Sequence, residues 1–331
     1  MSTWLLKAEN DPLTAIRHFL LGVWSNAGLE GMLVPIYETG DKAIKTTLIH
    51  DPYLLSDADP MAPLMQINAG KTVAALARKN PNARFAAVLR ACEARALDEL
   101  TKSDSPRLEN WLIIGTDCLG CFPAQDFEWR VQKAGSVEQM TRDLLRNARQ
   151  GGIAFDRFRS ACRMCDKPEP SQVDLCIDLL GLPVKDSILI FARDEALARK
   201  LDLDAITDGP APLELIVQHN LMLKKIEERR QRARARQLRQ LAPDLPSNLD
   251  ELADFLLECQ PCRSCIEACP VHAEELTSAM ERGVLSRDLL KHWLMSCAEC
   301  GMCEQACPRG VPLAAIMNRI SRELRSEPLA V

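Results

Sequence analysis

A repeated cysteine motif constrains this chain more than any other feature. The pattern C-x2-C-x2-C-x3-C-P occurs at residues 259–270 and again at residues 297–308. Three cysteines at this spacing hold one iron–sulfur cubane, while the fourth, before the proline, typically binds the other cluster. Zinc sites favour two separated C-x2-C pairs, which these runs fit poorly. We expect two 4Fe–4S clusters, one held by Cys259, Cys262, Cys265 and Cys307 and the other by Cys297, Cys300, Cys303 and Cys269.

Helical patterns surround both motifs. Amphipathic segments cover Ser247–Glu258, Glu274–Arg282, Ser286–Leu294 and Pro312–Arg325, and Ser286 is a suitable N-cap. This helical module resembles the α-helical ferredoxin domains of the iron–sulfur subunits of fumarate reductase and heterodisulfide reductase. The resemblance covers residues 247–331 and implies that the module transfers electrons.

The first two thirds of the chain alternate strand-like and helical segments. This alternation predicts an α/β layer architecture. The expected strands are Gly31–Ile36, Arg84–Leu89, Trp111–Gly115 and Asp186–Phe191, and the expected helices are Lys71–Lys79, Ala94–Lys102, Val137–Arg149 and Asp194–Leu201. We therefore expect an α/β N-terminal domain followed by an all-α dicluster ferredoxin domain.

A basic segment separates the two regions. Residues 221–240 are strong helix formers with many arginines and lysines, and prolines at 243 and 246 end this segment. We interpret it as a solvated connecting helix, with docking of an acidic partner as the alternative. Because the whole chain has a net charge of −5, we expect no nucleic-acid binding. The expected domains are residues 1–222, a charged helical linker at 223–246, and residues 247–331.

Six further cysteines lie in the first region. Cys118 and Cys121 form one C-x2-C pair, and Cys162 and Cys165 form another. Two such pairs suit either a 4Fe–4S cluster or a zinc ion, and a thioredoxin-like redox motif is a further option. Cys92 stands alone in sequence, whereas Cys176 lies in an apolar run and is expected to be a buried core residue.

Three segments of this region are similar to the beta subunits of coenzyme F420 (deazaflavin) hydrogenases and formate dehydrogenases. They are the strand, cysteine turn and helix at residues 85–97, the strand ending in a cysteine at 113–118, and C-x2-C-x-D at 162–166 followed by an apolar, glycine-ended run at 173–181. The resemblance spans about residues 45–195. It implies a third 4Fe–4S cluster on Cys92, Cys118, Cys162 and Cys165, with Cys121 as an alternative ligand in place of Cys92.

The same resemblance implies a bound FAD that exchanges a hydride with a coenzyme. The matching segment contains Asn68, Gly70 and Lys71, which are the candidate flavin-binding residues. Neither a G-x-G-x-x-G fingerprint nor a P-loop occurs in the sequence, so a dinucleotide fold and a nucleotide P-loop are not expected.

The sequence also bears on location. It has no apolar run of the roughly 18 residues that a membrane span needs, and its first residues lack the basic start of a signal peptide. Fourteen cysteines without such a signal favour metal binding in the reducing cytoplasm. Our hypothesis is an iron–sulfur, flavin-containing electron-transfer subunit of a hydrogenase, formate dehydrogenase or heterodisulfide-reductase-like complex. The alternative is a flavin-free relay and docking subunit with no substrate of its own.

Overall fold

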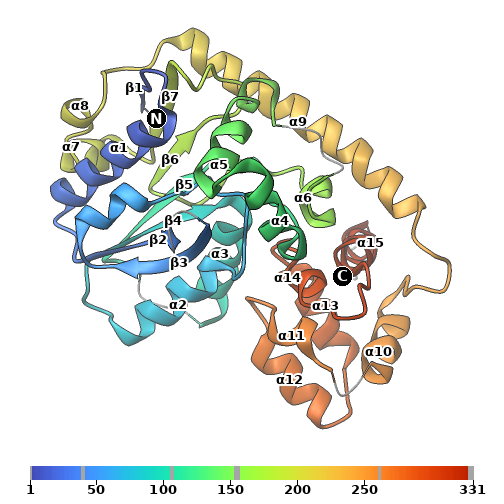
Figure 1. Cartoon of the computed structure of the whole chain (residues 1–331). Coiled ribbons are helices and arrows are strands. Elements are labelled where there is room, and N and C mark those ends of the chain that lie inside the picture. Colours follow the sequence, from blue (N-terminus) through green and yellow to red (C-terminus); the bar gives the residue numbers. More distant parts are fainter. Residues whose placement is uncertain (1, 39–41, 105–107, 153–156, 260–261, 327–331) are drawn as a thin grey trace.

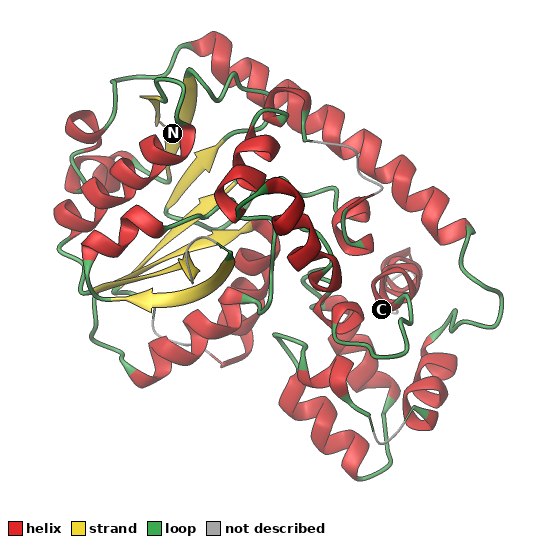
Figure 2. Cartoon of the chain, in the orientation of Figure 1, coloured by secondary structure: helices red, strands yellow, loops and turns green. Residues whose placement is uncertain are grey.

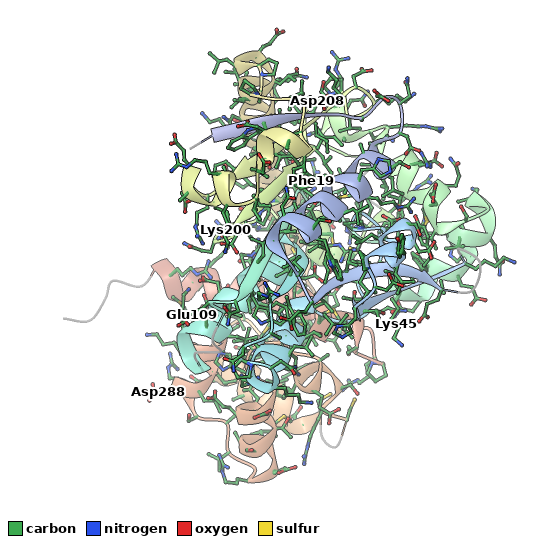
Figure 3. The ribbon with its side chains drawn as sticks, turned by 90° about the vertical axis from the view of Figure 1, so that its left-hand side faces the viewer. Phe19, Lys45, Glu109, Lys200, Asp208 and Asp288 are labelled. Carbon is green, nitrogen blue, oxygen red and sulfur yellow. The ribbon has the colours of Figure 1, made fainter. Side chains whose placement is uncertain are left out.

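The computed structural model describes residues 2–38, 42–104, 108–152, 157–259 and 262–326. These residues form a mixed α/β domain followed by a helical region that carries the repeated cysteine motif (Figures 1 and 2). The expected fold class is therefore confirmed. In a side view the helical region lies beyond one end of the α/β domain, with Asp288 far from Asp208 (Figure 3).

One seven-stranded sheet organises the α/β domain. Its strand order is β1-β7-β6-β5-β4-β2-β3. The four inner strands β2, β4, β5 and β6 run parallel, while β7, β1 and β3 are antiparallel to their neighbours. Their bounds are Ser2–Lys7 (β1), Gly31–Glu38 (β2), Ala43–Ile49 (β3), Phe85–Arg90 (β4), Trp111–Thr116 (β5), Leu175–Asp178 (β6) and Ser187–Ala192 (β7).

Helices cover both faces of the sheet. On β4, Ala86 and Val88 point into a large core with helices α1, α4 and α5, whereas Phe85, Ala87 and Leu89 point into a smaller core with α2 and α3. Because both faces are covered, the central strands read as continuous apolar runs. The helices are α1 (Pro12–Ala27), α2 (Ala69–Lys79), α3 (Ala91–Asp104), α4 (Ala124–Ala134), α5 (Val137–Leu145), α6 (Ser160–Met164), α7 (Glu195–Lys200) and α8 (Leu203–Ile206), with short 3-10 turns at Pro52–Asp57 and Ala148–Gln150.

The four expected strands correspond to β2, β4, β5 and β7 and are confirmed to within two residues at each end, whereas β6 was seen in the sequence only as part of an apolar run. Edge strands β1 and β3 were not expected from the sequence. β3 is partly exposed along most of its length, so its residues lack the continuous apolar character of the inner strands. Both edge strands form through antiparallel pairing to one neighbour, which local sequence does not reveal.

The C-terminal region has its own helical core. Residues such as Leu252, Leu290 and Ile320 are fully buried against one another. Ser286 caps its helix as expected, since its hydroxyl accepts the backbone N–H of Leu289. The helices are α10 (Leu249–Glu258), α11 (Ser264–Glu267), α12 (Ala273–Glu281), α13 (Arg287–Met295), α14 (Met302–Gln305) and α15 (Leu313–Ser326).

One long helix, α9 (Leu213–Arg239), joins the two regions and runs along the outside of the molecule (Figure 1). The expectation of a merely solvated helix is wrong for Arg230 and Arg234, which are only 2% and 6% exposed. Their side chains lie against α6 rather than in water. In the described part of the chain, no helix is both long and apolar enough to cross a bilayer.

Candidate metal centres

The sequence repeat of the cysteine motifs is also a repeat of backbone conformation. Arg263 and Gly301, each following the second cysteine of its motif, both adopt the left-handed conformation with φ of 48° and 68°. A one-turn helix begins directly after each of them, and these two helices, α11 and α14, pack together. The left-handed residue turns the chain so that the third cysteine of each motif can lie beside the first two.

The first C-terminal group of thiols assembles around Cys265. Burial and, after it, the nearby thiols of Cys307, Cys259 and Cys262 raise the pKa of the Cys265 thiol to about 11. The guanidinium of Arg309 lies 3.5 Å from the Cys259 sulfur. The structure thus brings together the four cysteines expected to hold one cluster.

The second group assembles around Cys303. Burial raises the pKa of this thiol well above its usual value, and Cys297, Cys300 and Cys269 contribute next. The indole N–H of Trp293 points at the Cys269 sulfur at 3.3 Å. Cys269 therefore crosses from the first motif to the second group, as the motif predicts.

A third group of thiols lies at the ends of the parallel strands of the α/β domain. Cys92 follows β4, Cys118 follows β5, and Cys162 and Cys165 lie in and after α6. Burial raises the pKa of Cys118 to about 11, with Cys162 and Cys165 among its charged neighbours. Desolvation and, after it, the Cys118 thiol raise the pKa of the half-buried Cys92. One thiol is thus close to the other three of this set.

The Cys121 thiol lies beside the same group and contacts one of its members, Cys162. It donates a hydrogen bond to Cys162, which holds the pKa of Cys162 well below its usual value, with help from the Arg159 guanidinium. Cys176 lies in β6 and is buried, as expected for a core residue. The Cys121 thiol thus lies against Cys162, while the Cys92 thiol lies near Cys118.

Helix α9 holds the backbone of the Cys162–Cys165 turn. The Nη1 of Arg230 donates to the carbonyl oxygens of Cys162 and Cys165, both at 3.0 Å. Arg234 donates to the carbonyl oxygen of Met164 at 2.8 Å and pairs with Asp166. Sequence reasoning missed these arginines because they resemble the exposed basic residues around them, and only a buried partner distinguishes them.

The third group lies directly against the second. The Cys300 thiol lies close enough to Cys92 to raise the pKa of the Cys92 thiol. Between the groups, Arg159 places one nitrogen 3.7 Å from the Cys162 sulfur and another 3.4 Å from Gln305. Gln305 also donates to the backbone oxygen of Met65 at 2.8 Å. The ferredoxin module is therefore attached to the α/β domain at the cysteine sites themselves.

The three candidate flavin residues lie at this same junction. Asn68 caps α2 by accepting the backbone N–H of Gly70 at 3.0 Å, and its amide lies beside Cys300. A side chain on Gly70 would meet the backbone oxygen of Glu93 at 2.3 Å, so glycine allows α2 to pack against α3. Lys71 donates to the backbone oxygen of Cys269 at 3.4 Å. In the structure their contacts are with protein.

The surroundings of the thiols suit iron–sulfur clusters. The buried Arg159 Nε finds no acceptor among the described residues although it lies next to these cysteines, and the side-chain amide of Asn68 faces Cys300. N–H groups aimed at cluster sulfurs are a common means of tuning cluster potential. Arg90, also buried, has Cys121, Cys118 and Cys92 as charged neighbours. The donor set and its N–H and cationic surroundings therefore fit the expected cofactor.

Comparison with known proteins agrees with the C-terminal assignment. Residues 258–311 match the family model of the 4Fe-4S dicluster domain. One chain of the F420-reducing [NiFe] hydrogenase complex from Methanosarcina barkeri superposes with a TM-score of 0.50 at 10% identity, over 71% of this chain and 91% of that chain. At this identity the likeness concerns the fold alone. Comparison with curated proteins gives no significant match.

The fold and these sites define a class. The chain carries a 4Fe–4S dicluster domain on a mixed α/β domain, and it is an iron–sulfur electron-transfer protein.

Proposed function

We propose that the protein is an electron-transfer subunit of a redox complex and binds three 4Fe–4S clusters. The observation that carries this proposal is the junction of the second and third thiol groups, where Cys92 and Cys300 lie close and Arg159 faces both groups. Each cluster, when bound, exchanges single electrons. The protein's residues supply thiolate ligands, shield them from water and offset their charge.

The ligand sets follow the groups of thiols. We assign Cys259, Cys262, Cys265 and Cys307 to the first cluster and Cys297, Cys300, Cys303 and Cys269 to the second. For the third we assign Cys92, Cys118, Cys162 and Cys165, supported by the position of Cys118 near the other three. Cys121, which contacts Cys162, is the alternative ligand.

The proposal includes FAD in the α/β domain, at a cavity that the candidate residues Asn68, Gly70 and Lys71 do not line. A cavity of about 590 Å³ lies beside β3 and α4 and is lined by Leu64, Gln66 and Phe127, among others. Its volume falls within the usual range for cofactor sites. The backbone oxygen of Leu64 also accepts a hydrogen bond from Arg90, whose side chain lies near Cys121, Cys118 and Cys92. A flavin there would convert hydride transfer into single-electron transfer.

The proposed partners are catalytic subunits of a hydrogenase, a formate dehydrogenase or a heterodisulfide-reductase-like complex in a reducing, cytoplasmic setting. The fold likeness to a chain of a hydrogenase complex supports this kind of partner. Copurification under anaerobic conditions, followed by identification of the bound subunits, tests it. Isolation of the protein alone, with no redox protein retained, would contradict the subunit assignment.

Iron analysis of the anaerobically purified full chain tests the cluster count. Three clusters require about 12 irons per chain. Cys92→Ser should remove one cluster's share of iron, whereas Cys176→Ser, which changes a buried thiol of the core, should not. Zinc in place of the third share of iron would overturn the three-cluster proposal. Retention of all iron in Cys92→Ser, with loss in Cys121→Ser, would select the alternative ligand.

Fluorescence of the supernatant after denaturation tests the flavin. One flavin per chain supports the hydride-to-electron function. Full iron content without flavin favours the second candidate, a relay and docking subunit with no substrate. That candidate is supported by Asn68 and Lys71, which contact the ferredoxin module in the structure.

A further inference from the structure

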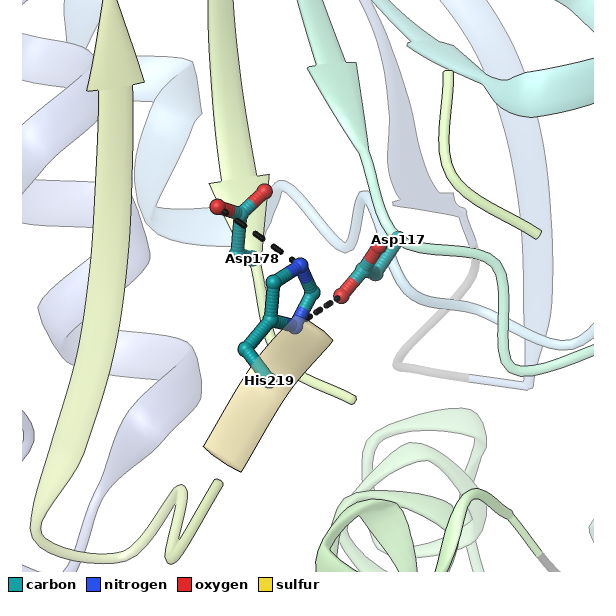
Figure 4. A group of neighbouring side chains, drawn as sticks. All are labelled: Asp117, Asp178 and His219. Atoms are coloured by element: carbon teal, nitrogen blue, oxygen red, sulfur yellow. Dashed lines mark ion pairs between the residues drawn. The ribbon is translucent and has the colours of Figure 1, made fainter. Parts of the chain in front are cut away.

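Three buried polar residues lie together outside the cysteine sites. Asp117 follows β5, Asp178 ends β6, and His219 lies in the first half of α9. One potential ligand atom of each lies within 4.8 Å of the other two. Their exposed fractions are 1%, 6% and 3%. Figure 4 shows the imidazole between the two carboxylates, so three elements distant in sequence meet at this point.

Backbone hydrogen bonds orient two of these side chains and leave ligand atoms free. Oδ2 of Asp117 accepts the N–H groups of Leu179 and Leu180 at 2.7 and 2.8 Å. Nδ1 of His219 lies 2.8 Å from the Leu180 carbonyl oxygen, which can only accept, so Nδ1 carries the proton. Among the described residues, Asp117 Oδ1, Asp178 Oδ1 and His219 Nε2 find no partner.

In this arrangement two electron-pair donors, a nitrogen of His219 and a carboxylate oxygen of Asp178, face each other. With Nδ1 protonated in the neutral ring, Nε2 presents a lone pair, and Asp178 Oδ2 lies 3.8 Å from it. That separation is too long for a hydrogen bond and is close to the roughly 3.4 Å between two ligands of a tetrahedral metal ion at about 2.1 Å. In the described chain, carboxylate oxygens of Asp117 and Asp178 lie 3.7 and 3.8 Å from the imidazole nitrogens, and neither carboxylate pairs with a lysine or arginine. Glu169 adds further negative charge nearby.

We propose that Asp117, Asp178 and His219 bind one divalent transition-metal ion, separate from the cysteine sites. A set of one imidazole and two carboxylates suits Zn²⁺, Mn²⁺ or Fe²⁺, whereas Mg²⁺ and Ca²⁺ prefer oxygen ligands alone. A histidine that donates its other N–H to a backbone carbonyl is the usual arrangement behind a metal ligand. The ion would fasten α9 to the ends of β5 and β6.

This position connects the proposed ion to the third thiol group. The same helix carries Arg230, which holds the Cys162–Cys165 turn further along. Fixing α9 at His219 therefore fixes the direction from which Arg230 reaches that turn. The role assigned to the ion is structural and does not depend on whether the protein binds flavin.

Metal analysis of the cluster-loaded full chain tests the site. Wild-type protein is incubated anaerobically with MnCl₂ or ZnCl₂, freed of excess metal by gel filtration, and compared with Asp178→Asn and His219→Gln. We expect about one equivalent of added metal in the wild type and a loss of at least tenfold in affinity in both variants. Iron content should stay unchanged.

Asp59→Asn provides a matched control. Asp59 is also fully buried, but its oxygens accept hydrogen bonds from Tyr37, Thr141 and the backbone of Met61. This variant should bind the added metal as the wild type does. Equal uptake by all variants would place the metal at cysteines and overturn the proposal.

A second measurement needs no variant. Ligand binding to the folded state alone raises the melting temperature, and at a hundredfold excess over Kd a rise of about 5 °C is expected with Mn²⁺ or Zn²⁺. MgCl₂ should have no such effect. Absence of both uptake and stabilisation in the wild type would overturn the proposal. Because iron is counted separately, that result would leave the cluster assignment standing.

Discussion

Arg159 is one of the residues that lie beside the cysteine groups of both domains. Its side chain is buried and faces the Cys162 sulfur, and its positive charge acts to lower the pKa of the Cys300 thiol. A guanidinium keeps its positive charge even when buried. It can therefore offset the negative charge of two neighbouring clusters at once, which makes electron uptake by either of them more favourable.

Replacing Arg159 with methionine should lower the reduction potential of the clusters on both sides of the junction. The expected shift is on the order of tens of millivolts, because one nearby positive charge is lost. Redox titration followed by electron paramagnetic resonance measures it. Arg130→Met is the control, since Arg130 packs on Phe122 and Trp129 and pairs with Asp126. Equal shifts in both variants would contradict a local effect.

Gly301 is required for two separate reasons. Its φ of +68° is costly for any other residue, and an added side-chain carbon would lie 2.4 Å from the Cβ of Ala161. Gly283 has nearly the same φ, +69°, with nothing within 4 Å. The two glycines therefore separate the cost of conformation from the cost of the close approach between domains.

Alanine at these positions should give different results. Gly283→Ala should lower the free energy of unfolding by about 1–2 kcal/mol, the cost of a left-handed non-glycine residue. Gly301→Ala should lower it by at least 1 kcal/mol more, since the domains must also move apart. Denaturant unfolding of both variants measures the difference. Equal decreases in the free energy of unfolding would show that the close contact with Ala161 adds nothing to the cost of the substitution.

At the scale of elements, α9 combines a connecting helix with a support for the third thiol group. Arg230 and Arg234 satisfy three backbone oxygens of the Cys162–Cys165 turn, while the neighbouring Arg232 is exposed and pairs with Glu228 on the same helix. Buried carbonyls that lose their donors cost about 1–3 kcal/mol each. The turn should therefore depend on the buried arginines alone.

Arg230→Met should destabilise the third cluster selectively. We expect faster loss of one cluster's share of iron under a chelator, with the other shares retained. Arg232→Met should behave as the wild type. Iron release followed by absorbance at cluster wavelengths gives the rates. Equally faster iron release from all clusters would indicate that the variant unfolds in general, and would contradict a local role of Arg230 at the third cluster.

At the scale of the molecule, the ferredoxin module combines its own core with an attachment through its second cysteine group. Cys300 and Met302 pack into the core of the α/β domain, whereas Leu252 and Leu290 belong to the separate helical core. Metal binding commonly contributes directly to the folding of small modules of this kind. Cluster removal should therefore affect the C-terminal region first.

Iron removal should unfold the helical region while leaving the α/β domain folded. The expected signs are a partial loss of helical circular dichroism and an earlier elution in size-exclusion chromatography. Limited proteolysis should then release a fragment that ends within or after α9. An iron-free protein with unchanged dichroism and elution would contradict this division of stability.

The parts predicted from sequence are those with a local signal. The cysteine motifs, the Ser286 cap and the inner strands each depend on spacing or composition within a few residues. The pairing of β1 with β7, the contact of Gly301 with Ala161, and the burial of Arg230 join segments far apart in the chain. Such contacts depend on how the layers assemble, so neither motif spacing nor propensity could reveal them.

The attachment of the module at its second cysteine group bears on how such a protein can evolve. Arg159 and Ala161 of the α/β domain contact Gln305 and Gly301 of the ferredoxin module. Because of these contacts, recombination cannot freely exchange one region for that of another protein. A foreign ferredoxin module would keep its own clusters, yet it would need a glycine where Gly301 meets Ala161 and an acceptor for Arg159. Substitutions at these positions should therefore track one another whenever this pairing of domains is inherited.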